Sequence, residues 1–294
     1  MASPLRRGIA QASLAYACWG VFPLYFKALQ AVPPLELLAH RVAWSLVFVG
    51  ALLAWQRRWA WLGPALRDGA VLRSFGASAL LIAANWFLYI WAVVNDRIVE
   101  SSLGYFINPL VNVLLAALVL HERLRRGQWA AVALAAAGVA WLTWQAGALP
   151  WIALALACSF AGYGLLRKTA PLGALEGLAM ETLMLGPLAV GVLALLAWQG
   201  SARFVDAGLG TQALLLAAGP VTAIPLLLFA AGARRIPFAL LGLLQYIGPT
   251  LQLLVGVWVF GEPFGASQAV GFALIWAALA LYSAEGWWLQ RSTA

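Results

Sequence analysis

Ten stretches of the chain are almost wholly apolar and long enough to cross a bilayer, and this feature limits the possible folds more than any other. About 20 apolar residues form one helix across a hydrocarbon core of roughly 30 Å, where a helix satisfies its own backbone hydrogen bonds. We therefore predict an all-α integral membrane protein with ten transmembrane helices. The predicted segments are 8–29, 35–55, 72–94, 99–120, 128–145, 149–166, 175–198, 211–233, 238–260 and 266–287.

The composition excludes a soluble enzyme or binding domain. Of the 294 residues, 64% are hydrophobic and 10% are charged, a balance that soluble domains of this length do not have. The longest connection, residues 56–71, is too short for a further domain, so any function lies inside the bundle. We expect the first segment to be retained, because its apolar span is longer than that of a cleavable signal peptide.

The net charge of +8 indicates orientation rather than a nucleic-acid partner. If the N-terminus is cytoplasmic, 14 of the 18 Lys and Arg residues fall in cytoplasmic loops and chain ends, as the positive-inside rule requires. Both termini are then expected to be cytoplasmic. The other four cations are Lys27, Arg41, Arg97 and Arg203.

A shift of 140 residues aligns the two halves of the chain. Pro109 falls on Pro249, and Glu122 falls on Glu262 thirteen residues later in each helix. Further matches join Gln128 to Gln268, Glu36 to Glu176 and Cys18 to Cys158. We predict two repeats, 8–145 and 148–287. Because each holds five helices, an odd number, the second repeat enters from the opposite side, which gives a 5+5 inverted-topology repeat suited to alternating access.

Polar side chains at membrane depth are costly unless they face the bundle interior or water. Asn108 and Asn112 share a face of the fourth segment, and Asn85 lies in the third. We predict that such residues line a shared cavity; the alternative is that they only join helices by hydrogen bonds. The predicted substrate-binding residues are Trp19, Tyr25, Lys27, His40, Arg41, Asn85, Trp86, Tyr89, Tyr105, Asn108, Asn112, Tyr163, Glu181, Thr222, Gln245, Tyr246 and Gln252.

Three titratable groups have more than one interpretation. Arg41 pairs either with an anionic group of the substrate or with a carboxylate such as Glu181, or it snorkels. Lys27 binds a carboxylate or marks the membrane interface. His40 is a proton-linked switch or a structural hydrogen-bonding group. Cys18 and Cys158 are expected to be buried small residues, with no metal site and no disulfide.

Glycines and prolines interrupt several of the predicted helices. They are either hinges or static bends, because a proline removes a backbone hydrogen bond. The predicted hinge residues are Gly20, Pro23, Pro109, Pro220, Pro225 and Pro249. Segments 128–145 and 266–287 carry mostly small apolar residues, so we expect them to be peripheral, with a homodimer contact as one use.

Several strings resemble one family of membrane proteins. They are "WGVFPLYFK" and "ELLAHRVAWS", "ANWFLYIWAV", "SLGYFINPLVNVLL" with "HERL", and "LQYIGPTLQ" with "GEPF". Together they identify the chain as similar to the EamA family of the drug/metabolite transporter superfamily. This resemblance implies ten helices in two EamA repeats, a bacterial inner-membrane location and transport of small organic molecules through a cavity between the halves. Arg41 matches an arginine that recurs in such proteins.

The expected function is therefore a secondary active or facilitative transporter. We expect it to export small amphipathic or zwitterionic metabolites, such as amino acids or drugs like chloramphenicol, by alternating access. A flippase or scramblase for lipids or lipid-linked intermediates is the alternative. The chain lacks HExxH, GxSxG and nucleotide-binding motifs, so we predict no enzyme activity and no cofactor. The expected partners are the solute and membrane lipid, without nucleic acid.

Overall fold

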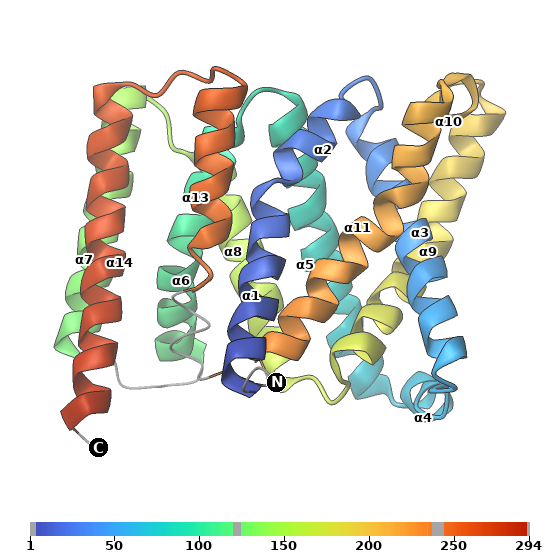
Figure 1. Ribbon diagram of the computed structural model, residues 1–294, viewed down its shortest axis with the longest axis horizontal. Helices are drawn as coiled ribbons and strands as arrows, with labels where there is room; N and C mark the ends of the chain where they lie inside the picture. The colour runs from blue at the N-terminus through green and yellow to red at the C-terminus, as the bar shows by residue number, and fades with distance from the viewer. Residues whose placement is uncertain (1–3, 120–124, 234, 237–243, 293–294) are drawn as a thin grey trace.

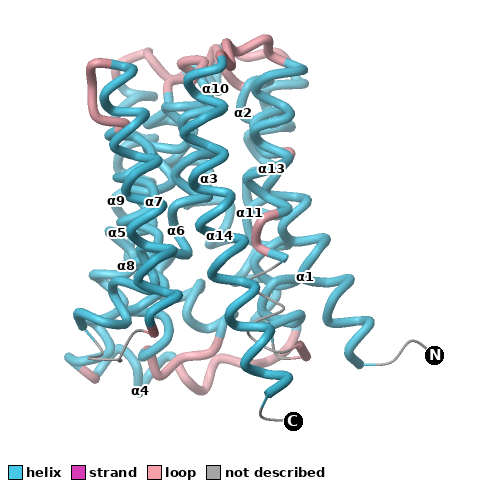
Figure 2. Tube along the Cα trace, turned by 90° about the vertical axis from the view of Figure 1, so that its left-hand side faces the viewer, coloured by secondary structure: helices cyan, strands magenta, loops and turns pink. Residues whose placement is uncertain are grey.

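The computed structural model describes residues 4–119, 125–233, 235–236 and 244–292, and within these ranges the regular structure is entirely helical. Figure 1 shows long helices standing side by side, with the two chain ends at the same end of the bundle. We call this the terminal end and the opposite one the far end. Figure 2 shows most loops gathered at these two ends, as expected if a bilayer surrounds the middle of the bundle.

The helices of the first half are α1 (Pro4–Gly20), α2 (Phe22–Ala28), α3 (Pro34–Trp55), α4 (Leu62–Arg67), α5 (Gly69–Val94), α6 (Ile98–Val119) and α7 (Arg126–Ala146). Those of the second half are α8 (Trp151–Thr169), α9 (Ala174–Trp198), α10 (Arg203–Asp206), α11 (Leu209–Ala233), α13 (Ile247–Leu254) and α14 (Ala266–Ser292). A π-helical segment, η1 (Val255–Val259), continues α13.

The prediction of an all-α membrane protein is confirmed. Six helical stretches within the described residues are long and apolar enough to span a bilayer: Pro4–Ala28, Pro34–Trp55, Gly69–Val94, Arg126–Ala146, Ala174–Trp198 and Leu209–Phe229. Shorter apolar helices cover Trp151–Arg167, Ile247–Val259 and Ala266–Tyr282. The count of ten crossings and the division into repeats 8–145 and 148–287 stay predictions.

Local sequence explains where the helices begin and end. The Asp68 carboxylate accepts hydrogen bonds from the N–H groups of Ala70 at 2.8 Å and Val71 at 3.3 Å, which caps α5. Gly147 ends α7 with a φ of +65°, a conformation that favours glycine. The break between α1 and α2 lies at Val21, just before Pro23 in the first turn of α2.

Helix contacts between the halves are reciprocal. Within the described residues α3 packs on α9, α6 on α13, and α7 on α14. The 140-residue shift maps each of these pairs onto itself, and it maps the contact of α1 with α11 onto that of α8 with α5. A two-fold relation between the halves would produce this pattern, and it brings polar residues of both halves together in the middle of the bundle.

Helices α7 and α14 lie at one edge of the row, on the left in Figure 1. A Cβ added at Gly138 would lie 3.0 Å from the backbone oxygen of Gly271, so the two helices approach as closely as small residues permit. Their place at the edge agrees with the expectation that segments 128–145 and 266–287 are peripheral. The homodimer contact stays a prediction.

Candidate functional site

Arg41 of α3 is a buried cation surrounded by aromatic rings. Its Nε donates a hydrogen bond to Thr222 Oγ1 of α11 at 2.8 Å. Its Cζ lies 4.1 Å from the centre of the Trp86 ring, with Phe22 at 5.7 Å and Phe26 at 5.6 Å. Cation–π attraction therefore holds the guanidinium between α2, α3 and α5.

Arg41 does not pair with Glu181, and that predicted alternative is wrong. The Glu181 carboxylate of α9 accepts hydrogen bonds from Ser78 Oγ at 2.7 Å and the Tyr163 hydroxyl at 3.3 Å. Arg167 Nη1 lies 3.7 Å from the same carboxylate. Each of the two buried charges thus has its own surroundings, because they lie at different depths of the bundle.

The 140-residue shift nevertheless relates these two charges, because it carries the position of Arg41 onto that of Glu181. Arg41 lies seven residues after Pro34, the first residue of α3, and Glu181 lies seven residues after Ala174, the first residue of α9. Helix α3 begins at the far end and α9 at the terminal end (Figure 1). A cation therefore lies in the far half of the bundle and a carboxylate in the terminal half.

Asn85 joins three helices by hydrogen bonds. Its Nδ2 donates to the Leu156 backbone oxygen and to Ser159 Oγ of α8, each at 3.0 Å. Its Oδ1 accepts a hydrogen bond from the Tyr105 hydroxyl of α6 at 3.4 Å. Because the protein uses both ends of this amide, Asn85 positions α5, α6 and α8 rather than offering a free polar group.

Asn108 and Asn112 differ in burial, although they lie one turn apart on α6. Asn108 is 1% exposed, and its Oδ1 has no hydrogen-bond donor among the described residues. Asn112 is exposed. A buried carbonyl without a donor is unfavourable and is a candidate for binding a solute. Asn108 is thus the stronger candidate of the two.

The predicted hinge residues lie in two kinds of position. Pro109 lies inside α6, and Pro220 and Pro225 lie inside α11. Pro249, in contrast, lies in the first turn of α13, where a missing N–H costs no helical hydrogen bond. Gly20 ends α1, and a Cβ there would meet Leu251 at 2.6 Å, so this position also permits close packing.

Among the remaining predicted polar residues, Lys27 and Tyr25 bind groups outside their own helix, whereas His40 is bonded within α3. Lys27 Nζ lies 2.6 Å from the Asp96 carboxylate, and the Tyr25 hydroxyl donates to the Leu214 backbone oxygen at 2.7 Å. His40 Nδ1 accepts a hydrogen bond from Trp44 Nε1 at 3.2 Å, and its Nε2 lies 3.9 Å from Glu36 Oε1.

Helix α13 is tied to α1 in the same way. Gln252 Nε2 donates to the Trp19 backbone oxygen at 3.1 Å. Gln245 and Tyr246 lie partly buried in the turn before α13. Together with Arg41, Asn85 and Glu181, these bonds make the boundary between the halves the polar part of the bundle.

Two buried glutamates connect the halves at the far end. Glu262 accepts hydrogen bonds from the N–H groups of Ile98 and Val99, each at 2.7 Å, and so caps α6. Glu36 accepts hydrogen bonds from the N–H groups of Arg203 at 3.1 Å and Phe204 at 3.0 Å. Burial raises the pKa of the Glu262 carboxyl, and the two backbone donors oppose that rise. We call these bonds the far-end contacts.

An ion pair of α9 connects the halves at the terminal end, in addition to the peripheral pair of Arg125 with Glu285 between α7 and α14 at 3.9 Å. The guanidinium of Arg58, in the loop after α3, binds the carboxylate of Glu176 in the first turn of α9. We call this pair the terminal-end contact. The polar boundary between the halves is therefore bridged at both ends.

Replacing Glu262 with alanine is expected to destabilise the protein by about 2 to 4 kcal/mol, because two buried N–H groups at the start of α6 lose their acceptor. Glu262→Gln keeps one acceptor oxygen and is expected to lose about half as much. Thermal unfolding in detergent checks both values. Equal unfolding midpoints for the wild type and Glu262→Ala would show that this cap does not support α6.

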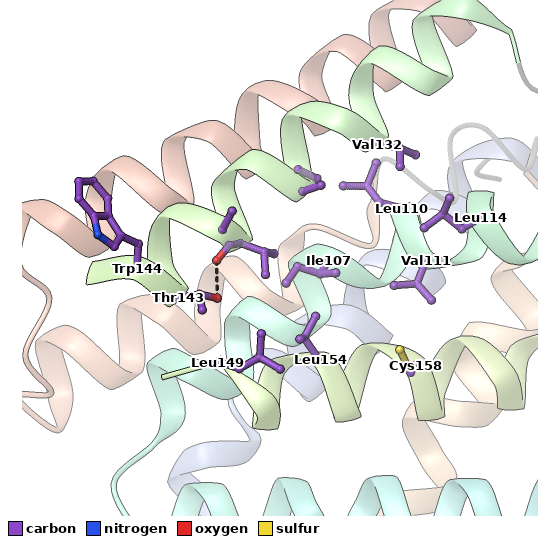
Figure 3. Close-up of a pocket in the computed structure, with 14 residues that line it drawn as sticks. Ile107, Leu110, Val111, Leu114, Val132, Thr143, Trp144, Leu149, Leu154 and Cys158 are labelled. Atoms are coloured by element: carbon purple, nitrogen blue, oxygen red, sulfur yellow. Dashed lines mark hydrogen bonds between the residues drawn. The ribbon is translucent and has the colours of Figure 1, made fainter. Parts of the chain in front are cut away.

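An apolar groove of about 700 Å³ lies between α6, α7 and α8 (Figure 3). Its lining includes Ile107, Val132 and Leu154, and its one hydroxyl, on Thr143, donates to the Val139 backbone oxygen at 2.8 Å. Cys158 lines it and is exposed, so the prediction that this cysteine is buried is wrong: its face of α8 borders the groove. The groove suits an acyl chain rather than a polar solute.

Three residues of the site were not predicted from the sequence: Ser78, Ser159 and Arg167. Ser78 lies seven residues before Asn85, and Ser159 and Arg167 lie four residues on either side of Tyr163, so helical spacing would have found them. Within the described residues, no group of three or more His, Cys, Asp or Glu residues could hold a metal ion. Glu122 lies outside the described residues.

Comparisons with known proteins agree with one another. Residues 6–144 match the EamA-like transporter family. An uncharacterized transporter of Pseudomonas aeruginosa is 47% identical over 96% of this chain and 95% of its own length. Protein RarD of Escherichia coli strain K12 is 44% identical over 100% of this chain and 99% of its own length.

A more distant relative, the chloramphenicol-sensitive protein RarD of Pseudomonas aeruginosa, is 34% identical over 96% of this chain and 94% of its own length. A solved crystal structure that is 24% identical superposes with a TM-score of 0.60 over 94% of this chain and 97% of that one, which supports the fold alone. These matches confirm the resemblance to the EamA family and to RarD proteins within it.

Proposed function

This chain belongs to the EamA-like transporter family, and from that premise we propose that it is a secondary active or facilitative exporter of small amphipathic or zwitterionic metabolites. It is a multi-pass membrane transporter, as the family and the apolar helices indicate. Amino acids are the first solutes to test. Chloramphenicol is a second, since the printed name of one relative mentions it.

One observation carries the proposal: buried polar side chains lie along the boundary between the halves, and bonds between the halves bridge it at both ends. Arg41, Asn108 and Glu181 are buried along this boundary. The far-end contacts and the terminal-end contact close the two sides. Breaking them in turn would expose the same polar region to either side of the membrane, which is the alternating access that inverted repeats permit.

We propose a bacterial inner-membrane location with both chain termini cytoplasmic. The terminal end carries Arg57, Arg58, Arg67 and Arg73, which the positive-inside rule places in the cytoplasm. The proposed partners are a small solute and membrane lipid, and a homodimer would use α7 and α14. Nucleic acid is not among them, because the cations are explained by orientation.

The reconstituted protein tests the proposal directly. Proteoliposomes containing the full chain are expected to take up labelled phenylalanine faster than protein-free vesicles, and unlabelled phenylalanine inside should accelerate uptake by exchange. Chloramphenicol serves as the second probe. Absence of flux with both probes, in vesicles that contain correctly folded protein, would contradict the proposed solute class.

A flippase or scramblase is the second candidate, because the apolar groove between α6, α7 and α8 suits an acyl chain. The same vesicles distinguish the two functions when they contain a fluorescent phospholipid whose outer-leaflet copies are quenched from outside. Quenching of only the outer leaflet supports the solute transporter. Quenching of both leaflets supports the flippase.

Glu181 is proposed to couple transport to protons, because it is a buried carboxylate on the solute path. A pH gradient imposed across the vesicle membrane is expected to change phenylalanine accumulation by up to about tenfold per pH unit if one proton is coupled to each solute. Glu181→Gln should keep exchange but lose this response, while Glu100→Gln, which changes a carboxylate paired only within the first half, keeps it. An unchanged response in Glu181→Gln would assign coupling elsewhere, with His40 the next residue to test.

A further inference from the structure

Arg41 has a buried donor group that the protein does not use. The residue is 5% exposed, and its Nη1 has no acceptor among the described residues. Its Nε is already bound to Thr222. Within the described part of the chain, no carboxylate oxygen lies within 4.0 Å of the guanidinium. A buried cation without an anion is strongly unfavourable, so this site favours an anionic ligand.

Tyr89 of α5 supplies a second unused donor beside the first. It is 3% exposed, and its hydroxyl has no partner among the described residues. Its ring packs against Phe26 at 5.8 Å, and Phe26 lies under the Arg41 guanidinium. The Phe26 ring thus contacts both the guanidinium, at 5.6 Å, and the Tyr89 ring. Two unpaired donors from different helices therefore border the same aromatic ring.

A carboxylate matches these donors. Its two oxygens can accept hydrogen bonds from Arg41 Nη1 and from the Tyr89 hydroxyl at the same time, and hydrogen bonds between charged groups are the strong ones. The rings of Trp86, Phe26 and Tyr105 line the same region and suit an apolar body.

An ammonium group does not match the same surroundings. It would face the Arg41 guanidinium, whose like charge repels it, and the Trp86 face that attracts cations is already occupied by that guanidinium at 4.1 Å. The unpaired carbonyl of Asn108, on α6 one turn from Tyr105, offers an acceptor to a further N–H or O–H group of the solute. Binding of a carboxylate at Arg41 does not require this further N–H or O–H group on the solute.

We propose that Arg41 and Tyr89 bind the carboxylate of the transported solute, which makes the protein selective for organic monocarboxylates with an apolar body. This inference rests on the proposed transport function and names its substrate class. The amino group of an amino acid strengthens binding through Asn108 but does not decide this selectivity, and solutes that carry only a positive charge are rejected.

Three probes of similar shape test the proposal: 3-phenylpropanoate, its neutral amide 3-phenylpropanamide, and the cation phenethylamine. Tryptophan fluorescence titrations on the purified full chain are expected to show the acid binding about ten times or more tighter than the amide, with the amine weakest. Arg41→Gln should remove this preference and Arg41→Lys should keep part of it. Arg97→Gln, which removes an exposed cation, is the matched control and should bind like the wild type.

A second variant tests the same site in case Arg41→Gln does not fold. Tyr89→Phe removes only a hydroxyl group and is expected to weaken acid binding about three- to tenfold while leaving amide binding unchanged. The thermal unfolding midpoint of each variant without solute shows whether it is folded. Equal affinities of the wild type for acid and amide, or an unaltered preference in both variants, would overturn the proposal.

Flux measurements separate this inference from the transport function. Uptake of the amide or the amine at the rate of the acid would leave transport standing and overturn the carboxylate selectivity. Selective binding of the acid without flux of any probe would support the carboxylate site and contradict transport of this solute class.

Discussion

Joining the two halves at the terminal end is expected to stop transport completely. Arg58→Cys and Glu176→Cys, linked by a short bifunctional maleimide, would make the terminal-end contact permanent. Alternating access requires this end to open in every cycle, so phenylalanine uptake should fall to the level of protein-free vesicles. The background carries Cys18→Ala and Cys158→Ala, because Cys158 is exposed and would react.

A second pair of cysteines within one half controls for the effects of the maleimide treatment itself. Arg97→Cys with Glu100→Cys links an ion pair of 3.3 Å that lies within the first half, and uptake should persist after the same treatment. Lys27→Cys with Phe260→Cys joins the halves at the far end, where the Lys27 ammonium lies 5.8 Å from the ring centre, and should also stop transport. Continued uptake after complete linkage at either end would rule out alternating access through that end.

Replacing Asn108 with leucine is expected to lower phenylalanine uptake about ten- to hundredfold while the protein stays folded. The buried Oδ1 has no donor among the described residues, so its removal leaves no partner unpaired and costs little stability. A hydrogen bond from the solute ammonium to this carbonyl would be lost, and bonds to charged groups are the stronger kind. Initial uptake rates and unfolding midpoints measure the two effects.

Asn112→Leu provides the matched control, one turn along the same helix. Because Asn112 is exposed, we now expect its replacement to change uptake much less than that of Asn108. The sequence alone gave no reason to separate the two residues, since both lie on one helical face. If both variants transport at the wild-type rate, the amides serve helix packing rather than solute binding.

The positions of the helices were predictable because hydrophobicity acts locally. Segments 35–55, 72–94 and 128–145 coincide closely with α3, α5 and α7, since each apolar run both forms and ends its own helix. The short helices α4 and α10 were not predicted, because runs of six and four residues carry no periodic signal.

The partners of the buried charges were not predictable from the sequence. Helical spacing placed Arg41, Asn108 and Glu181 inside the bundle, but it could not choose between a pair of Arg41 with Glu181 and separate surroundings. That choice depends on the packing of α3 against α9 and α11 and on the depth of each residue. Ser78 and Tyr163 reach Glu181 from other helices, whereas Arg41 meets Thr222 and aromatic rings.

The amino-acid sequence by itself determined the all-α membrane class, the helix positions and the family, because apolar length and short motifs are properties of consecutive residues. Only the tertiary structure decided that Glu36 and Glu262 bind N–H groups of the opposite half, and that Arg41 and Tyr89 keep unpaired donors. Such contacts join residues far apart in the chain, and their geometry exists only when the helices have packed.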